Sequence, residues 1–167
     1  MVIWIIGLSG SGKTYLSKKI FKRLKGKKIL VDGDTVRKYI TYNLKYTKTD
    51  REKNSLLISD LCKFLESQNF TVVCSILSIF RNHQKINRNK FENYFQIYLK
   101  TELAKVKKRN NKNIYSYSNV VGKKINFPRP YKNDIVIQND FLHYTKEKIN
   151  QIINKINDIK KNKKKNY

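Results

Sequence analysis

The glycine-rich segment Gly7–Thr14, with the sequence GLSGSGKT, constrains this chain more than any other feature. It follows five apolar residues, Val2–Ile6, and precedes apolar residues at helical spacing, Leu16, Ile20 and Leu24. Such a setting predicts a buried strand, a loop of the pattern G-x-x-x-x-G-K-S/T that binds phosphate, and a helix. A chance glycine-rich turn would lack this setting. We therefore predict an ATP-phosphate site formed by Gly7, Ser9, Gly10, Ser11, Gly12, Lys13 and Thr14.

The last two residues of this loop have side chains suited to phosphoryl transfer. Lys13 should reach the β- and γ-phosphates of a nucleotide and stabilise the charge that develops there, which makes it a catalytic candidate. The Thr14 hydroxyl should ligate Mg²⁺, a hard cation that prefers oxygen ligands. The sequence thus predicts ATP and Mg²⁺ as cofactors.

Predicted strands and helices alternate along the rest of the chain. Further apolar runs predict strands at 29–31, 70–77, 94–99 and 134–138. Helical spacing predicts helices at 13–24, around 36–40, from 49 onward, within 78–88, at 102–109 and at 149–159. This alternation predicts an α/β fold of the P-loop NTPase class, a five-stranded, parallel, doubly wound sheet with helices on both faces.

The helix that begins near residue 49 carries two sequence signals. Thr49–Glu52 has the form of a capping box, in which the Thr and Glu side chains satisfy free backbone N–H groups. The apolar residues that follow predict a core-facing stripe. They are Leu57, Leu61, Phe64 and Leu65.

A length of 167 residues suits a single domain, which we place at 1–159. The polar and basic stretch at 107–133 contains Pro128 and Pro130, and these predict an irregular, mobile lid. Residues 160–167 are almost all Lys and Asn, which predicts a disordered basic tail.

The formal charge of +25 admits two interpretations. It favours an anionic partner such as nucleic acid, but abundant Lys with Asn and Ile also fits a compositional bias on solvated surfaces. We favour the second, with no nucleic acid or membrane partner. Cys62 and Cys74 are expected to be reduced core residues. Because the apolar run at 2–6 is too short for a signal peptide or membrane span, we expect a cytoplasmic protein.

Two carboxylates, Asp32 and Asp34, follow the second predicted strand, at the edge where parallel sheets bind ligands. Either could accept the proton of an attacking hydroxyl or hold the Mg²⁺ water shell. The alternative is an Asp-Gly turn in which Asp34 caps the next helix. Arg37 follows one helical turn later and could bind an anionic substrate on the same face.

Taken in order, several segments make the chain similar to the adenylylsulfate (APS) kinases over residues 1 to 140. They are Gly7–Thr14; Asp32-Gly33-Asp34 with Arg37; Asp50-Arg51 with Asn54; Ser75–Ser78 with Arg81; and Arg109 with Lys112, Ile114 and Tyr115. The resemblance implies transfer of the ATP γ-phosphate to the ribose 3′-hydroxyl of a small nucleotide. It also implies a possible homodimer, since many members are dimeric.

The resemblance also implies roles for individual residues. Asp34 and Ser78 would lie at the phosphoryl-transfer centre, and Arg109 and Lys112 would contact ATP, with Lys112 in the lid. Tyr46 and Phe127 would hold the substrate base between aromatic rings, although core packing would explain both equally well. The remaining substrate-binding candidates are Asp32, Arg37, Arg51, Asn54 and Arg81.

Departures from the family pattern concern the substrate side. The paired arginines of D-R-x-x-N-I/L-R-R are replaced by Leu56 and Leu57, and the F-T-G-I-D loop is reduced to a stretch around Phe127. These departures favour the branch of the family that phosphorylates cytidine diphosphoramidate in capsule biosynthesis. An APS kinase with altered loops is the alternative, and a P-loop polynucleotide kinase or a non-catalytic nucleotide sensor are further ones.

Overall fold

The computed structural model describes residues 1–109, 120–141 and 146–164. Its strands are β1 (Val2–Ile6), β2 (Lys28–Asp32), β3 (Thr71–Ile76), β4 (Tyr94–Lys100) and β5 (Ile135–Gln138). Its helices are α1 (Lys13–Arg23), α2 (Gly33–Tyr39), α3 (Lys48–Ser67), α4 (Arg81–Lys90), α5 (Leu103–Arg109) and α6 (Lys146–Lys164). The strands form one parallel sheet, as the sequence predicts, and the structure gives their order as β2-β3-β1-β4-β5.

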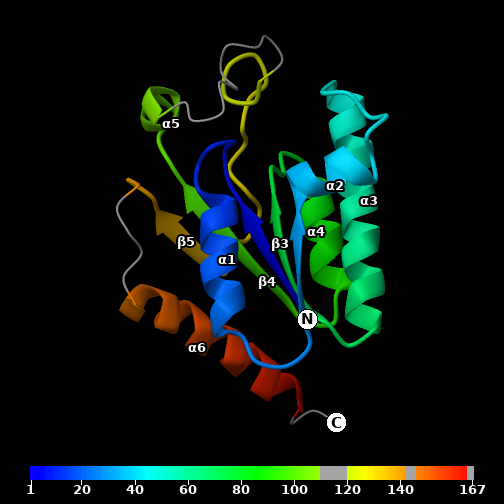
Figure 1. Ribbon diagram of the computed structural model, residues 1–167, viewed down its shortest axis with the longest axis vertical. Coiled ribbons are helices and arrows are strands. Elements are labelled where there is room, and N and C mark those ends of the chain that lie inside the picture. The colour runs from blue at the N-terminus through cyan, green and yellow to red at the C-terminus, as the bar shows by residue number, and fades with distance from the viewer. Residues whose placement is uncertain (110–119, 142–145, 165–167) are drawn as a thin grey trace.

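The central strand β1 divides the core into two halves. Its side chains alternate between faces, and all five of its residues are buried. Ile3 and Ile5 pack with α1 and α6, whereas Val2, Trp4 and Ile6 pack with α2 and α3. Figure 1 shows α1 and α6 on one side of the sheet and α2, α3 and α4 on the other. The sheet is therefore doubly wound.

The carboxyl ends of the strands lie along the upper edge of the sheet in Figure 1. The loop after β1, the start of α2, helix α5 and residues 120–131 gather around this edge. Residues 107–109 of the predicted lid belong to helix α5, whereas residues 120–133 are irregular, with one isolated bridge between Val121 and Ile125. Ligands of open parallel sheets bind at such an edge.

Helix α3 begins two residues earlier than its predicted capping box. Thr47 is the N-cap, because its hydroxyl accepts a hydrogen bond from Asp50 N at 3.1 Å. The Asp50 carboxylate in turn accepts from the Thr47 hydroxyl at 2.8 Å and from Lys45 N at 3.2 Å. The predicted Thr49–Glu52 box is thus wrong, and Glu52 is available for other contacts.

The predicted stripe of α3 has the right period but is wrong at two positions. Leu57 and Phe64 are 49% and 61% exposed, while Leu61 and Leu65 are partly buried against the core. The buried face consists mostly of small and polar side chains. These are Asn54, Ser55, Ile58, Ser59, Cys62 and Glu66. A search for large apolar residues misplaces such a face, because its hydrogen bonds satisfy the polar groups that it buries.

Three remaining expectations concern the cysteines, the C-terminal end and membranes. Cys62 and Cys74 are buried free thiols, as predicted. Helix α6 continues to Lys164, so residues 160–164 are helical and do not begin a disordered tail there. Lysine is a good helix former and is favoured at helix C-termini by the dipole. No helix of the described residues is long and apolar enough to cross a membrane.

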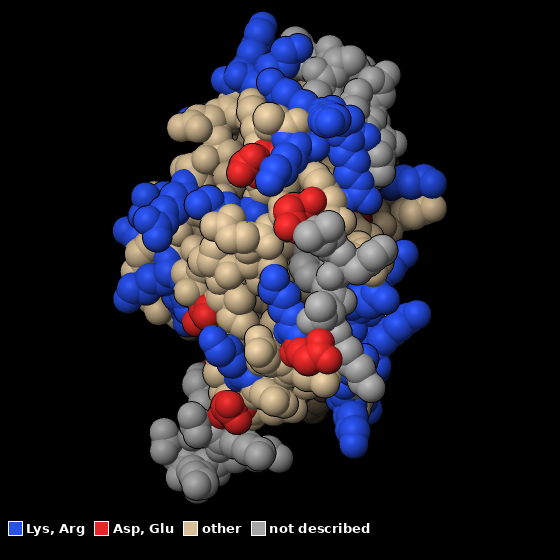
Figure 2. Space-filling view, turned by 90° about the vertical axis from the view of Figure 1, so that its left-hand side faces the viewer, with Lys and Arg blue, Asp and Glu red and all other residues tan. Residues whose placement is uncertain are grey.

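Basic side chains cover much of the surface. Figure 2 shows Lys and Arg spread from one end of the viewed face to the other, with few acidic residues between them. A groove that tracks a nucleic-acid strand would gather them along one line. On the face shown, the basic residues are spread out and do not follow one line.

Candidate active site

The loop between β1 and α1 has a backbone that only glycine adopts easily. Gly10 and Gly12 have φ values of 76° and 93°, in the left-handed region. A Cβ at Gly7 would lie 2.7 Å from Leu99 O and 2.8 Å from Ser11 Oγ, which leaves no room for a side chain. The N-cap of α1 is Gly12, which has no side chain to cover the positive end of the helix. The loop thus fits a chain of phosphate groups.

Two contacts hold the ends of this loop. Lys13 Nζ donates to Leu8 O at 2.7 Å, which folds the lysine side chain back across the loop. Asn139, just after β5, donates from Nδ2 to Ser11 O at 2.6 Å. The loop is therefore fixed to the sheet from a residue 128 positions away.

Thr14 and Asp32 meet beside the loop. The Asp32 carboxylate accepts from the Thr14 hydroxyl at 2.8 Å and from the Ser75 hydroxyl at 2.9 Å. It also accepts from Asp34 N at 3.1 Å and Thr35 N at 3.3 Å, so Asp32 is the N-cap of α2. The alternative in which Asp34 is the cap is wrong. Burial raises the pKa of Asp32, but these hydrogen bonds outweigh burial and hold the pKa below its ordinary value.

The oxygen atoms of this cluster suit a divalent cation that is shared with phosphate. No group of three or more His, Cys, Asp or Glu side chains that could hold a metal occurs among the described residues. Mg²⁺ usually takes one or two protein oxygens together with phosphate oxygens and water. Thr14 and Asp32 are a donor set of this kind. Asp34 lies next to it, exposed, in the first turn of α2.

Three predicted substrate-binding residues lie together, with Arg37 and Arg51 against the ring of Tyr46. The Arg37 and Arg51 guanidinium carbons lie 4.8 and 5.2 Å from the ring centroid. Arg37 Nη1 donates to Leu44 O and Lys45 O, both at 2.9 Å, and Arg51 Nε donates to Tyr46 O at 3.1 Å. Burial and then the charge of Arg37 lower the pKa of Arg51. Two cations held this close favour an anion beside them.

Two other predicted residues are buried within the protein. Asn54 Oδ1 accepts from the Thr41 hydroxyl, which links α3 to the end of α2. Ser78 is 1% exposed, and its hydroxyl accepts from Gln84 Nε2 at 3.2 Å. Gln84 Oε1 also accepts from Tyr131 N at 2.6 Å, so it joins the Ser78 loop to the segment before β5. Nothing in the sequence pattern singled out Gln84.

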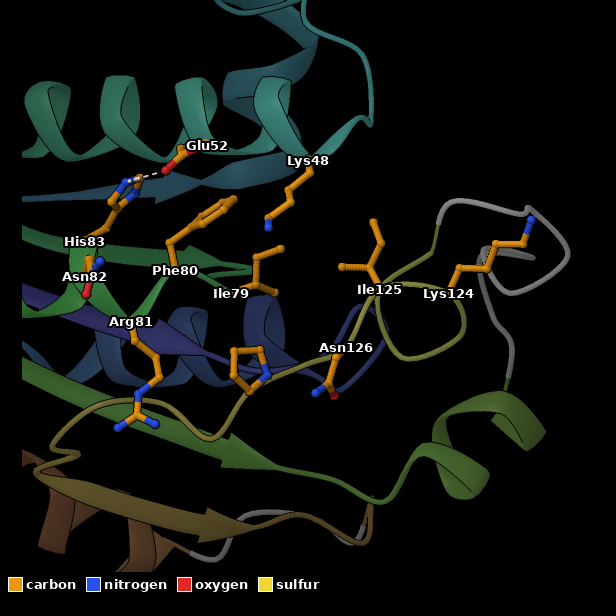
Figure 3. Close-up of a pocket in the computed structure, with 11 residues that line it drawn as sticks. Lys48, Glu52, Ile79, Phe80, Arg81, Asn82, His83, Lys124, Ile125 and Asn126 are labelled. Atoms are coloured by element: carbon orange, nitrogen blue, oxygen red, sulfur yellow. Dashed lines mark ion pairs between the residues drawn. The ribbon is translucent and has the colours of Figure 1, made fainter.

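A pocket of about 600 Å³ opens between α3, the start of α4 and residues 124–128 (Figure 3). It is lined by Lys48, Glu52, Ile79, Phe80, Arg81, Asn82, His83, Lys124, Ile125, Asn126 and Pro128. Ile79 packs in one cluster with Leu8 of the phosphate loop, so the pocket and the loop are neighbours. Arg81 is the one predicted substrate residue in this lining.

Phe127 does not line this pocket, although its neighbours Asn126 and Pro128 do. Its ring lies 6.0 Å from that of Tyr98 and packs against the core clusters. The base-stacking role of Phe127 stays a prediction, and in this structure its ring is partly buried against the core. Phe80 supplies the aromatic wall instead. In the sequence, the position of Phe80 two residues after the predicted site residue Ser78 could have identified it as a candidate.

The departures on α3 also lie outside the pocket. Leu56 and Leu57, which replace the paired arginines, are 42% and 49% exposed and do not line it. Their neighbour Ser55 contacts it indirectly, since His83 Nδ1 lies 3.2 Å from Ser55 Oγ. Loss of the arginines therefore leaves the charge of the pocket lining unchanged.

Arg109 and Lys112 were predicted on the ATP side. Arg109 ends α5, is exposed, and has its guanidinium 4.5 Å from the centroid of the Phe141 ring. Phe141 lies two residues after Asn139, and its backbone N–H donates to the Asn139 side chain. The same side chain holds the phosphate loop through Ser11 O. Arg109 thus lies close to the segment that holds this loop. Lys112 lies outside the described residues.

A phosphate loop with Lys13 and Thr14, an adjacent carboxylate and a pocket with basic residues define a P-loop kinase. The adenylylsulphate kinase family model matches residues 1–138. The chain belongs to the adenylylsulphate kinase family and is an APS kinase-like nucleotide kinase.

Two curated relatives illustrate the range of the family. The chain is 32% identical to the cytidine diphosphoramidate kinase of Campylobacter jejuni over 164 residues, covering 93% of this chain and 95% of the relative. It is 31% identical to the adenylyl-sulfate kinase of Halothermothrix orenii over 119 residues, covering 70% and 64%. The first match runs nearly end to end, whereas the second covers less than two thirds of the relative.

Solved structures agree on the fold. The Mycobacterium tuberculosis APS kinase, in complex with AMPPNP and APS, superposes with a TM-score of 0.82 at 23% identity, covering 92% of this chain and 95% of that one. At this identity the similarity establishes the fold alone.

Proposed function

We propose that this protein transfers the γ-phosphate of ATP to the ribose 3′-hydroxyl of cytidine diphosphoramidate, a step in capsule phosphoramidate biosynthesis. The main support is the near end-to-end similarity to the Campylobacter jejuni enzyme, which covers 93% of this chain. The departures from the APS kinase pattern at Leu56, Leu57 and Phe127 lie outside the pocket lining, so they do not bear on this choice. We also propose a single domain at 1–159 with a mobile basic lid at 107–133, a cytoplasmic location and a homodimer.

Bound ATP supplies the phosphoryl group, and Mg²⁺ neutralises part of its charge. Lys13, which donates to Leu8 O in this structure, would bind the phosphates, and Thr14 and Asp32 would hold the Mg²⁺. Asp34, exposed beside this cluster, accepts the proton of the 3′-hydroxyl. Arg109 and Lys112 contact ATP from the lid side.

On the acceptor side, Arg37 and Arg51 bind the anionic group at the 5′ end, beside Tyr46. Arg81 contributes a further positive charge from the pocket lining. Asn54 and Ser78 are buried and so have little surface to offer the substrate. Asn54 positions α3, and Ser78 positions the loop between β3 and α4.

Adenylylsulfate is the second candidate acceptor. It is favoured by the family model over residues 1–138. Both acceptors are nucleotides with an anionic 5′ extension, so the same arginines would serve either. The base and the 5′ group distinguish them.

The deciding experiment is an ADP-release assay with ATP and Mg²⁺ against cytidine diphosphoramidate and adenylylsulfate. We expect kcat/KM for cytidine diphosphoramidate to exceed that for adenylylsulfate by at least about 10-fold, equivalent to about 1.4 kcal/mol. Mass spectrometry of the product should place the phosphate on the 3′-oxygen. Equal or better turnover of adenylylsulfate would assign the protein to sulfate activation.

A further inference from the structure

The pocket beside the phosphate loop contains one carboxylate among its lining residues, and that carboxylate has no place in the roles above. Lys48, Arg81 and Lys124 give the lining a positive charge that suits a phosphorylated ligand. Glu52 lies among them with its side chain 50% exposed. A negative group in this position repels phosphate, so its presence calls for a part of the ligand that donates hydrogen bonds.

Glu52 is held in place by a buried histidine. His83 Nε2 lies 3.5 Å from Glu52 Oε1 (Figure 3). On its other side, His83 Nδ1 lies 3.2 Å from Ser55 Oγ. Burial lowers the pKa of His83 more than Glu52 raises it, so the imidazole is neutral at neutral pH and carries a single N–H. When that N–H is on Nε2 it donates to Glu52, and Nδ1 accepts from Ser55. This hydrogen bond orients one carboxylate oxygen of Glu52. Because His83 is neutral, Glu52 keeps its negative charge.

The surroundings of Glu52 suit a flat ring. The Phe80 ring lies 5.0 Å from His83 and projects into the same space as Glu52 and Lys48 (Figure 3). Ile125 and Pro128 line the other part of the pocket. A nucleobase that stacks on Phe80 would direct its polar edge toward the carboxylate.

We propose that Glu52, positioned by His83, accepts a hydrogen bond from the exocyclic amino group of the acceptor base. The proposal rests on the proposed function and names the residue that selects cytosine over uracil. A carboxylate only accepts hydrogen bonds, so it pairs with the amino group of cytosine and repels the carbonyl oxygen that uracil carries at the same position. Adenine also carries an amino group, so Glu52 discriminates among pyrimidines.

The test compares the wild-type enzyme with Glu52→Gln on cytidine and uridine diphosphoramidate. We expect wild-type kcat/KM to favour the cytidine compound by about 100-fold. In Glu52→Gln this ratio should fall by at least about 10-fold, because the amide can donate to uracil. His83→Asn should reduce the ratio in the same direction, mainly through KM, which a purely structural role of His83 would not do.

Asp60→Asn is the matched control, since it removes the same charge from the same helix outside the pocket lining. It should leave the ratio unchanged. Wild-type preference for the cytidine compound with an unchanged ratio in Glu52→Gln would overturn the assignment of Glu52 alone. Wild-type turnover confined to adenylylsulfate would overturn the proposed function and this assignment together.

Discussion

The phosphate loop and the pocket that we propose for the acceptor lie next to each other but are built in different ways. The loop is eight consecutive residues whose backbone carries the binding groups, with left-handed glycines at Gly10 and Gly12. The pocket is assembled from side chains of three separate segments, around residues 48–52, 79–83 and 124–128. A contiguous backbone site tolerates little change, whereas side chains from separate segments can be exchanged one at a time. With the acceptor bound in this pocket as we propose, this difference would let a family keep its phosphate donor and alter its acceptor.

The largest expected effect tests the loop. Lys13→Ala should reduce kcat by about 10³-fold, because the lysine stabilises charge that develops in the transition state. Steady-state kinetics with a thermal melt measure the change, and the melting temperature should stay close to the wild-type value. Lys18→Ala, an exposed lysine on the same helix, is the control. Near wild-type turnover of Lys13→Ala would show that catalysis occurs elsewhere.

The next effect tests the carboxylate between the two regions. Asp34→Asn keeps the shape of the side chain and removes its charge, so kcat should fall by about 10²-fold, the scale of a general base. ATP binding, measured by calorimetry, should change little. A loss of thermal stability without a loss of kcat would mean that Asp34 serves the helix rather than the reaction.

A crossed pair of variants tests which aromatic ring belongs to the pocket. Phe80→Ala should raise KM for the nucleotide acceptor about 10-fold through lost stacking, with KM for ATP unchanged. Phe127→Ala should lower the free energy of unfolding by about 2 kcal/mol and leave acceptor KM nearly unchanged, since Phe127 packs on Tyr98. Chemical denaturation and kinetics on both variants separate the two effects. The reverse pattern would return Phe127 to the acceptor site.

The smallest effect concerns the pH dependence at Asp32. Its pKa is lowered in the folded protein, so the ionised carboxylate stabilises the fold above its unfolded pKa, and this contribution is lost as pH falls through the folded pKa. Asn is also a good N-cap, so Asp32→Asn should keep α2 while removing the titration. Wild-type stability should therefore drop relative to the variant by up to about 1 kcal/mol below about pH 4. Urea titrations at several pH values measure the free energy of unfolding of both proteins. The same pH dependence in wild type and in Asp32→Asn would show that Asp32 does not cause the drop.

Helix α3 shows where sequence reasoning reached its limit. The helix and its approximate start were predicted, since both depend on residues close in sequence. Its buried face was not, because Asn54, Ser55 and Ser59 are polar and become buried only when partners from other segments satisfy them. Gln84 and His83 could not be predicted from the sequence for the same reason, because their partners lie on other parts of the chain.

The sequence by itself determined the phosphate loop, the parallel α/β fold and the family, because a contiguous motif and the periodicity of apolar residues depend on local geometry. Only the tertiary structure decided that Asp32 rather than Asp34 caps α2, that Arg37 and Arg51 meet on Tyr46, and that Phe80 rather than Phe127 lines the pocket. In an extended segment a shift of one residue reverses the side to which a side chain points. That choice is made by the packing of distant segments against one another, which no local pattern records.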